Sequence, residues 1–282
     1  MPTYDKKRGR YSVTCGGNQE GKINKSRKMR NVIQLLILVL IGLICGSILA
    51  MTIVKVRDAA DRARCYNNLK GLALAIANYH ECYRRFPTAA EENPDLPPEK
   101  RLSWIVAIWP FVEAGPLYSE MDHKKGWDAE ENRFAALLQL KLLDCPGCTV
   151  LPPTTKTPTC YIGITGIGTN AINLPLEDRR AGFFGYDRIL KAEGIKNHAG
   201  SILMLAETSQ LQGSWTAAGW HTARGLIPDG SPYVGAGGQF GGNHRNGANV
   251  AFADGSVRFV ENNIDPPVWE AMATLSGKSN RE

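Results

Sequence analysis

The sequence lacks the short motifs that mark common catalytic and metal centres. None of its five histidines pairs at the HExxH spacing of a zinc protease, and the Cys-x-x-Cys pair Cys145/Cys148 has no second pair to complete a zinc site. There is no GxSxG nucleophile turn, and GITGIGTN and GAGGQFGG match neither a phosphate loop nor a dinucleotide fingerprint. We therefore predict no metal, no cofactor and no enzymatic activity.

Beyond its N-terminus the chain also lacks a surplus of positive charge. Residues 1–31 hold nine Lys or Arg against two acidic residues, a net charge of +7. Because the whole chain carries +6 and residues 32–54 are uncharged, residues 55–282 sum to −1. A nucleic-acid-binding domain would carry its basic residues on the folded part. We predict no nucleic-acid partner.

One long apolar run is present, VIQLLILVLIGLICGSILAMTIV, from Val32 to Val54. As a helix it would reach roughly 35 Å, enough to cross a hydrocarbon core of about 30 Å. The positive-inside rule places the basic residues before it in the cytoplasm. We predict a disordered basic cytoplasmic tail (1–31), a transmembrane helix (32–54) and an extracytoplasmic domain (55–282).

The domain after the span combines helical and strand patterns. Apolar residues recur at helical spacing as far as Tyr83, so one helix is expected from about Asn31 to Tyr83. A second helix is expected over Asp128–Leu143, and strands over Thr159–Ala171 and Ser201–Thr208. The predicted fold is α+β, a long N-terminal transmembrane helix continuing into a head with an antiparallel β-sheet.

A β-hairpin is predicted near the C-terminus, with Asp254-Gly255 as a two-residue type I′ turn. In that register Phe252 pairs with Val257 and Val250 with Phe259, which places these apolar side chains on one face.

His244 precedes the first hairpin strand, and about five residues of strand separate that strand's start from the tip by roughly 15 Å. His244 and Asp254 therefore cannot easily share a proton or a metal ion. We interpret His244, Asp254 and Gly255 as a structural motif.

Five cysteines lie in the predicted extracytoplasmic domain, where disulfides persist. At most two bridges can form from an odd number. Cys145 has Cys148, Cys65 and Cys160 as candidate disulfide partners, and the sequence does not choose among them. Redox catalysis by Cys145 and Cys148 is disfavoured, because the pair follows a predicted helix instead of opening one.

Several stretches together resemble a large bacterial family, domain of unknown function 1559. They include ARCYNNLKGLALAIANYHECYRRFP, Cys145-Pro146, ILMLAET, and the prepilin-type-processing-associated motif of His, nine residues and Asp-Gly, here His244 through Asp254-Gly255. The resemblance implies a pilin-like head on an N-terminal membrane helix, exported across the inner (cytoplasmic) membrane and related to pseudopilins.

The segment before the span departs from the pilin pattern. It has no glycine at the cleavage position, and the fifth residue of the apolar run is Leu36 where pilins carry glutamate. We predict an uncleaved single-pass anchor with its N-terminus in the cytoplasm.

We expect a non-enzymatic protein that contacts envelope proteins, or further copies of itself, through a pilin-like head. Two alternatives stay open. One is a pseudopilin-type subunit of a type II secretion or type IV pilus-like assembly. The other is an envelope hydrolase using His244 or Glu207, the carboxylate at the end of the strand SILMLAET.

Overall fold

The computed structural model describes residues 3–5, 10–12, 19–112, 116–147, 158–195, 197–210, 213–228, 232–235, 237–241 and 244–279. The chain divides into two compact units, Met1–Arg57 and Asp58–Glu282, and helix α1 (Gln19–Tyr83) contributes residues to both. We call the second unit the head. Its other helices and strands are α2 (Trp104–Ile108), α3 (Leu117–Glu120), α4 (Arg133–Ala136), β3 (Tyr161–Ile167), β4 (Leu203–Glu207), β5 (Ala223–Leu226), β6 (Gly247–Phe252), β7 (Val257–Glu261) and α5 (Pro266–Met272).

The first unit holds a short antiparallel pair, β1 (Thr3–Asp5) and β2 (Arg10–Ser12), and the N-terminal part of α1. Helix α1 is long and apolar enough to cross a membrane, and its most apolar stretch has no buried residue. Residues 19–31, predicted to be part of a disordered tail, are helical. The stretch contains no proline and is rich in Lys, Arg, Gln and Glu, which favour helix.

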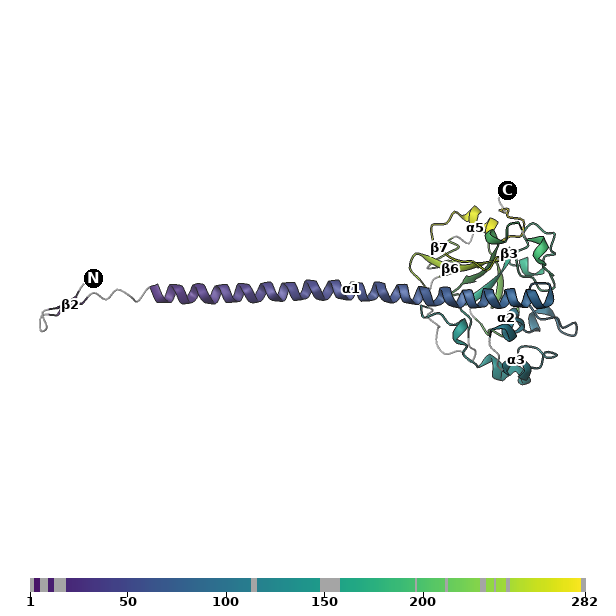
Figure 1. Cartoon of the computed structure of the whole chain (residues 1–282), viewed down its shortest axis with the longest axis horizontal. Helices are drawn as coiled ribbons and strands as arrows, with labels where there is room; N and C mark the ends of the chain where they lie inside the picture. The colour runs from purple at the N-terminus through teal and green to yellow at the C-terminus, as the bar shows by residue number, and fades with distance from the viewer. Residues whose placement is uncertain are drawn as a thin grey trace. The chain divides into compact units, whose positions relative to one another are not determined.

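The head contains a five-stranded sheet in the order β5-β3-β4-β6-β7. All neighbouring strands are antiparallel except β3 and β5, which are parallel. The predicted α+β fold class is confirmed. In Figure 1 the part of α1 that belongs to the head lies between this sheet and the segment carrying α2 and α3.

Both faces of the sheet are covered, each by its own apolar core. One core joins α1 (Leu69, Leu72, Ile76) and α2 to the sheet through residues such as Leu205 and Ala251. We call this side of the sheet the α1 face. The other core is built by α5 and the loop before β6, with Trp269 and Phe240 packed on the opposite side. Strands β3, β4, β5 and β6 are therefore an interior layer, and polar groups on them are shielded from water, whereas the edge strand β7 is partly exposed.

The register of the C-terminal hairpin differs by one residue from the prediction. Ala251 is opposite Val257 and Val250 is opposite Arg258. The Gly255 N–H donates to the Phe252 carbonyl (2.9 Å), and Gly255 has φ +78°, whereas Asp254 keeps negative φ. This is a type I turn followed by a glycine bulge, which adds one residue to the loop. Val257 consequently faces α1, opposite to the face of Val250 and Phe252.

The helix predicted over Asp128–Leu143 is also wrong. Only α4 and two flanking 3₁₀ turns form, and the chain is extended at Leu140. That break turns Leu142 toward Gly71 of α1 and buries Leu143, contacts that a straight helix would not make. Tertiary packing therefore outweighs local helix preference, and Leu137 is left 55% exposed.

A histidine in the loop after α3 gives the head a pH-dependent contact. His123 Nδ1 lies 2.8 Å from Glu91 Oε2, and Nε2 lies 2.9 Å from the Tyr118 carbonyl oxygen. Both partners are acceptors, so the ring makes both bonds only as an imidazolium. The hydrogen bond to Glu91 raises the pKa of His123 above its usual value of 6.5.

We expect the contribution of this contact to stability to be complete below about pH 6.5, the unfolded-state pKa, and to vanish as the pH rises through the higher folded-state pKa. The measurement is the thermal midpoint of the wild type and of His123→Gln against pH. The wild type should exceed the variant most in acid, and the gap should narrow in alkali. A gap that widened with pH would contradict the assigned charge state.

Candidate functional site

Helix α1 supplies the first residue of a buried polar cluster. Cys65 lies one, two and three helical turns before Leu69, Leu72 and Ile76, on the stripe of α1 that packs against the sheet. Its side chain is fully buried. The local sequence thus puts a thiol where an apolar residue would continue the stripe.

Strand β4 supplies a carboxylate from the opposite wall. A register irregularity between Leu203 and Leu205 turns Leu205, and with it Glu207 two residues later, toward the α1 face. Glu207 is 0% exposed. Its oxygens accept hydrogen bonds from the backbone N–H of Asn249 (2.7 Å) and from the Asn249 side-chain amide (2.9 Å).

Two loops supply the remaining residues. Cys145 follows the 3₁₀ turn Lys141–Leu143, which Asn68 of α1 holds by donating to the Asp144 carbonyl (2.8 Å). His244 precedes β6 and forms an isolated bridge with Gly247. Both side chains are buried, so the loops close the site on the sides that α1 and β4 leave open.

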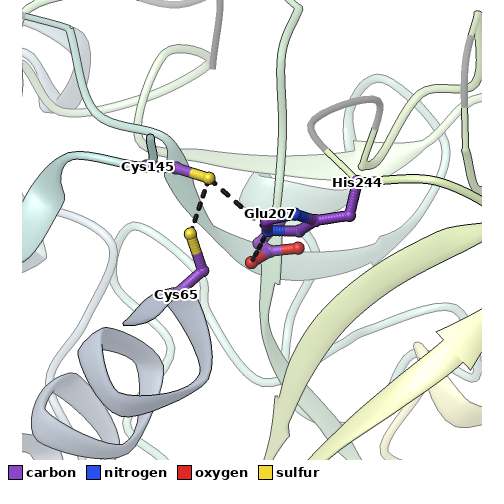
Figure 2. A group of neighbouring side chains, drawn as sticks. All are labelled: Cys65, Cys145, Glu207 and His244. Atoms are coloured by element: carbon purple, nitrogen blue, oxygen red, sulfur yellow. Dashed lines mark hydrogen bonds and ion pairs between the residues drawn. The ribbon is translucent and has the colours of Figure 1, made fainter. Parts of the chain in front are cut away.

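Cys65, Cys145, Glu207 and His244 converge, and we call them the Cys–His–Glu cluster (Figure 2). Their ligand atoms all lie within 4.8 Å of one another. The two sulfurs are 2.6 Å apart, His244 Nε2 is 3.6 Å from Cys145 Sγ, and the same nitrogen is 3.3 Å from Glu207 Oε1. Figure 2 shows the side chains pointing toward one another from a helix, two loops and a strand.

The close packing perturbs the acidity of the cluster. The hydrogen bond with Cys145 lowers the pKa of Cys65 to about 6, and the same bond together with burial raises the pKa of Cys145. For His244, burial opposes the charged form, but hydrogen bonds with Cys65 and Glu207 outweigh it and raise the pKa to about 10. The arrangement therefore favours one thiolate beside an imidazolium.

The two ends of the His-x9-Asp-Gly motif contact different parts of the head. His244 contacts Cys145 and Glu207, whereas Asp254 Oδ1 accepts from the backbone N–H (2.8 Å) and hydroxyl (2.6 Å) of Ser256 at the hairpin turn. Gly255 supplies the positive φ of the bulge. His244 therefore belongs to the buried cluster, and Asp254 stabilises the hairpin turn.

Among the candidate disulfide partners, the structure brings Cys65 to Cys145. Cys160 is buried one residue before β3 and is not part of the Cys–His–Glu cluster, and Cys148 lies outside the described residues. The sequence had singled out Glu207 and His244 separately but did not join them to the cysteines. Successive members of the four are 37 to 80 positions apart along the chain, and no local spacing links them.

A family model matches most of the head. Described as "Protein of unknown function (DUF1559)", it covers residues 54–173 and 186–267, more than half of the chain and all four residues of the Cys–His–Glu cluster. Neither a curated protein nor a solved structure matches. The family resemblance seen in the sequence is confirmed, and the chain belongs to the DUF1559 family of proteins of unknown function.

Proposed function

We propose that this protein is anchored by one pass of α1 in the bacterial inner membrane and that its head contacts other envelope proteins outside the cytoplasm. The candidate membrane helix supports the anchor. The excess of Lys and Arg before residue 32 supports a cytoplasmic N-terminus. The alternation of basic tail, apolar helix and nearly neutral head is the pattern of an exported domain held at the membrane surface.

The observation that carries the binding role is an apolar groove in the head. Its volume is about 560 Å³, and its apolar lining comes from Leu176, Ile189, Leu190 and Leu275. Leu176 and Ile189 remain 40% and 48% exposed. Charged residues of both signs, including Glu177, Arg179 and Lys191, also line the groove. Exposed apolar residues rimmed by polar ones mark interaction sites, and this groove suits an extended protein segment with apolar side chains.

Photo-crosslinking in intact cells tests the groove. A photoreactive residue at position 189 should capture a discrete envelope protein, and Ile189→Asp should reduce capture through a probe at position 176 by about tenfold or more, because it buries a charge in the contact. Leu137→Asp is the matched control, since Leu137 is equally apolar and exposed but lies outside the groove. Loss of capture with Leu137→Asp alone, or capture only of a second copy of this chain, would reject the groove as a site for another protein.

The topology has its own test. An impermeant thiol reagent applied to intact spheroplasts should label the exposed Cys82 of the head. Labelling of Cys82 only after the membrane is opened would reverse the orientation. The same extract gives an intact mass, and loss of the first thirty or so residues would favour the pseudopilin-type subunit over an uncleaved anchor.

The burial of Glu207 and His244 supports a binding role over hydrolysis. Their side chains are 0% and 1% exposed, and Glu207 is occupied by Asn249. A general acid or base must come within about 3 Å of substrate, and neither side chain meets solvent in this structure. The proposal is accordingly a non-enzymatic one.

A further inference from the structure

We propose that the Cys–His–Glu cluster is a structural site for a zinc-type divalent metal ion, held by Cys65, Cys145, His244 and Glu207. The site is independent of the partner binding proposed above. Two thiolates, an imidazole and a carboxylate are all ligands that Zn²⁺ accepts, and four protein ligands make a closed tetrahedral site of the structural kind.

Two of the observed separations match the edges of a zinc tetrahedron. With Zn–S bonds of about 2.3 Å and Zn–N and Zn–O bonds of about 2.0 to 2.1 Å, adjacent ligands lie about 3.5 Å (S to N) and about 3.3 Å (N to O) apart. The distance from Cys145 Sγ to His244 Nε2 is 3.6 Å, and from His244 Nε2 to Glu207 Oε1 it is 3.3 Å.

The two sulfurs lie too close together for a metal site and must move apart. They lie 2.6 Å apart, whereas a zinc tetrahedron needs about 3.8 Å and a disulfide about 2.05 Å. Cys145 belongs to a loop and is followed by Pro146 and Gly147, whereas Cys65 is fixed in α1. We therefore expect Cys145 to make most of the movement of about 1.2 Å that separates the two sulfurs. Metal binding would release the remaining thiol proton and the imidazolium proton to solvent, and no oxidant is needed.

The position of His244 Nε2 suits a shared metal ion better than a single N–H hydrogen bond. Nε2 faces Cys145 and Glu207 together, and a single N–H can be directed well at only one of them. A cation at the centre satisfies the nitrogen, both sulfurs and the carboxylate at once. Asn249 already fixes the carboxylate with two hydrogen bonds, as the groups that orient metal ligands do. The other ring nitrogen, Nδ1, is buried without a hydrogen-bond partner among the described residues.

The placement of the ligands defines what the ion would do. Cys65 comes from α1, Glu207 from β4, and Cys145 and His244 from the loops after the 3₁₀ turn and before β6. One ion would tie the head's part of α1 to the centre of the sheet. The stability of the head would then depend on metal, because binding to the folded state adds to its free energy of unfolding.

The test uses the full-length protein, extracted in detergent without chelator, one sample with a reductant for metal analysis and a parallel sample without a reductant for the disulfide analysis. We expect about one zinc ion per chain by elemental analysis. After removal of the metal, titration with Co²⁺ should give the intense visible bands of a tetrahedral ion and a thiolate-to-cobalt band in the near ultraviolet. Chelation should lower the thermal midpoint, and added Zn²⁺ should restore it.

Variants assign the ligands. Cys65→Ser should remove roughly half of the thiolate-to-cobalt absorption, since one of two thiolates is lost, whereas Glu207→Gln should keep that band and weaken metal affinity. Cys82→Ser, which removes an exposed cysteine of the same helix, should bind as the wild type does. If Cys65→Ser does not fold, the wild-type stoichiometry and cobalt spectrum still decide. A chain that holds no zinc, gives no tetrahedral cobalt spectrum after reduction, or shows a Cys65–Cys145 disulfide in unreduced peptides would overturn the site.

Discussion

Replacing Glu207 with alanine is expected to destabilise the head by about 3–5 kcal/mol, the cost of removing one partner from a buried charged pair. The carboxylate is 0% exposed and accepts both Asn249 hydrogen bonds. Without it, the Asn249 N–H and amide, and His244 Nε2, lose their acceptor in an interior that water does not reach. This loss is expected even in metal-free protein, because these contacts exist without an ion.

The measurement is denaturant unfolding followed by tryptophan fluorescence, since Trp104, Trp215 and Trp269 are fully buried and report on the head. Glu261→Ala is the matched control, because Glu261 also ends a strand, β7, but is exposed. We expect the control to change the free energy of unfolding by less than about 0.5 kcal/mol. Equal losses for the two variants would show that Glu207 is not held as the structure has it.

Periodicity in the sequence predicted the parts of the fold that local pattern determines. The helix that ends at Tyr83, the strand ending at Glu207 and the existence of the C-terminal hairpin all follow from the spacing of apolar residues. The failures occur where a distant contact decides the conformation. The helix expected after Asp128 is broken because Leu142 and Leu143 pack against distant parts of the head.

The hairpin register failed for a different reason. Asp-Gly fits a two-residue type I′ turn and the glycine bulge of a three-residue loop equally well, because both require positive φ at the glycine. The side chain of Asp254 favours the longer loop, since it accepts from the backbone N–H and the hydroxyl of Ser256. The apolar pattern does not indicate these two bonds. The one-residue shift places Val257 on the α1 face and Val250 on the opposite face, whereas the prediction had both on one face.

The Cys–His–Glu cluster could be predicted only in fragments. Cys65 could be paired with Cys145 as one of several disulfide options, while the recognised spacing between His244 and Asp254 pointed toward the hairpin tip instead of the core. The bulge between Leu203 and Leu205, which turns Glu207 to the α1 face, leaves no mark in the sequence. A search for Cys, His, Asp and Glu at the ends of predicted strands and helices would have collected Cys145, Glu207 and His244, whereas Cys65 lies inside α1 on its apolar stripe.

Replacing Gly166 with alanine should also destabilise the head strongly, by about 4 kcal/mol or more. Gly166 has φ +117°, and a Cβ there would lie 1.9 Å from the Arg180 carbonyl oxygen and 2.6 Å from the Gly182 nitrogen. Both obstacles are backbone atoms of a segment held beside β3 by the bonds Ile167 N–H to Arg180 O (2.9 Å) and Gly182 N–H to Thr165 O (2.8 Å). No side-chain rotation can relieve the clash, so β3 or its neighbour must be displaced.

Gly255→Ala is the control that isolates the cost of positive φ from the cost of a steric clash. Gly255 also has positive φ, +78°, but no atom lies within 4 Å of the position a Cβ would take. We expect this variant to lose only about 1–2 kcal/mol, the cost of a left-handed residue. Denaturant midpoints and folded yield of both variants provide the comparison. A loss for Gly166→Ala no greater than for Gly255→Ala would mean that the 180–182 segment does not lie against β3 as described. The expected difference would also show that the glycine of the His-x9-Asp-Gly motif is required for its backbone angle, while the histidine of that motif serves the buried cluster.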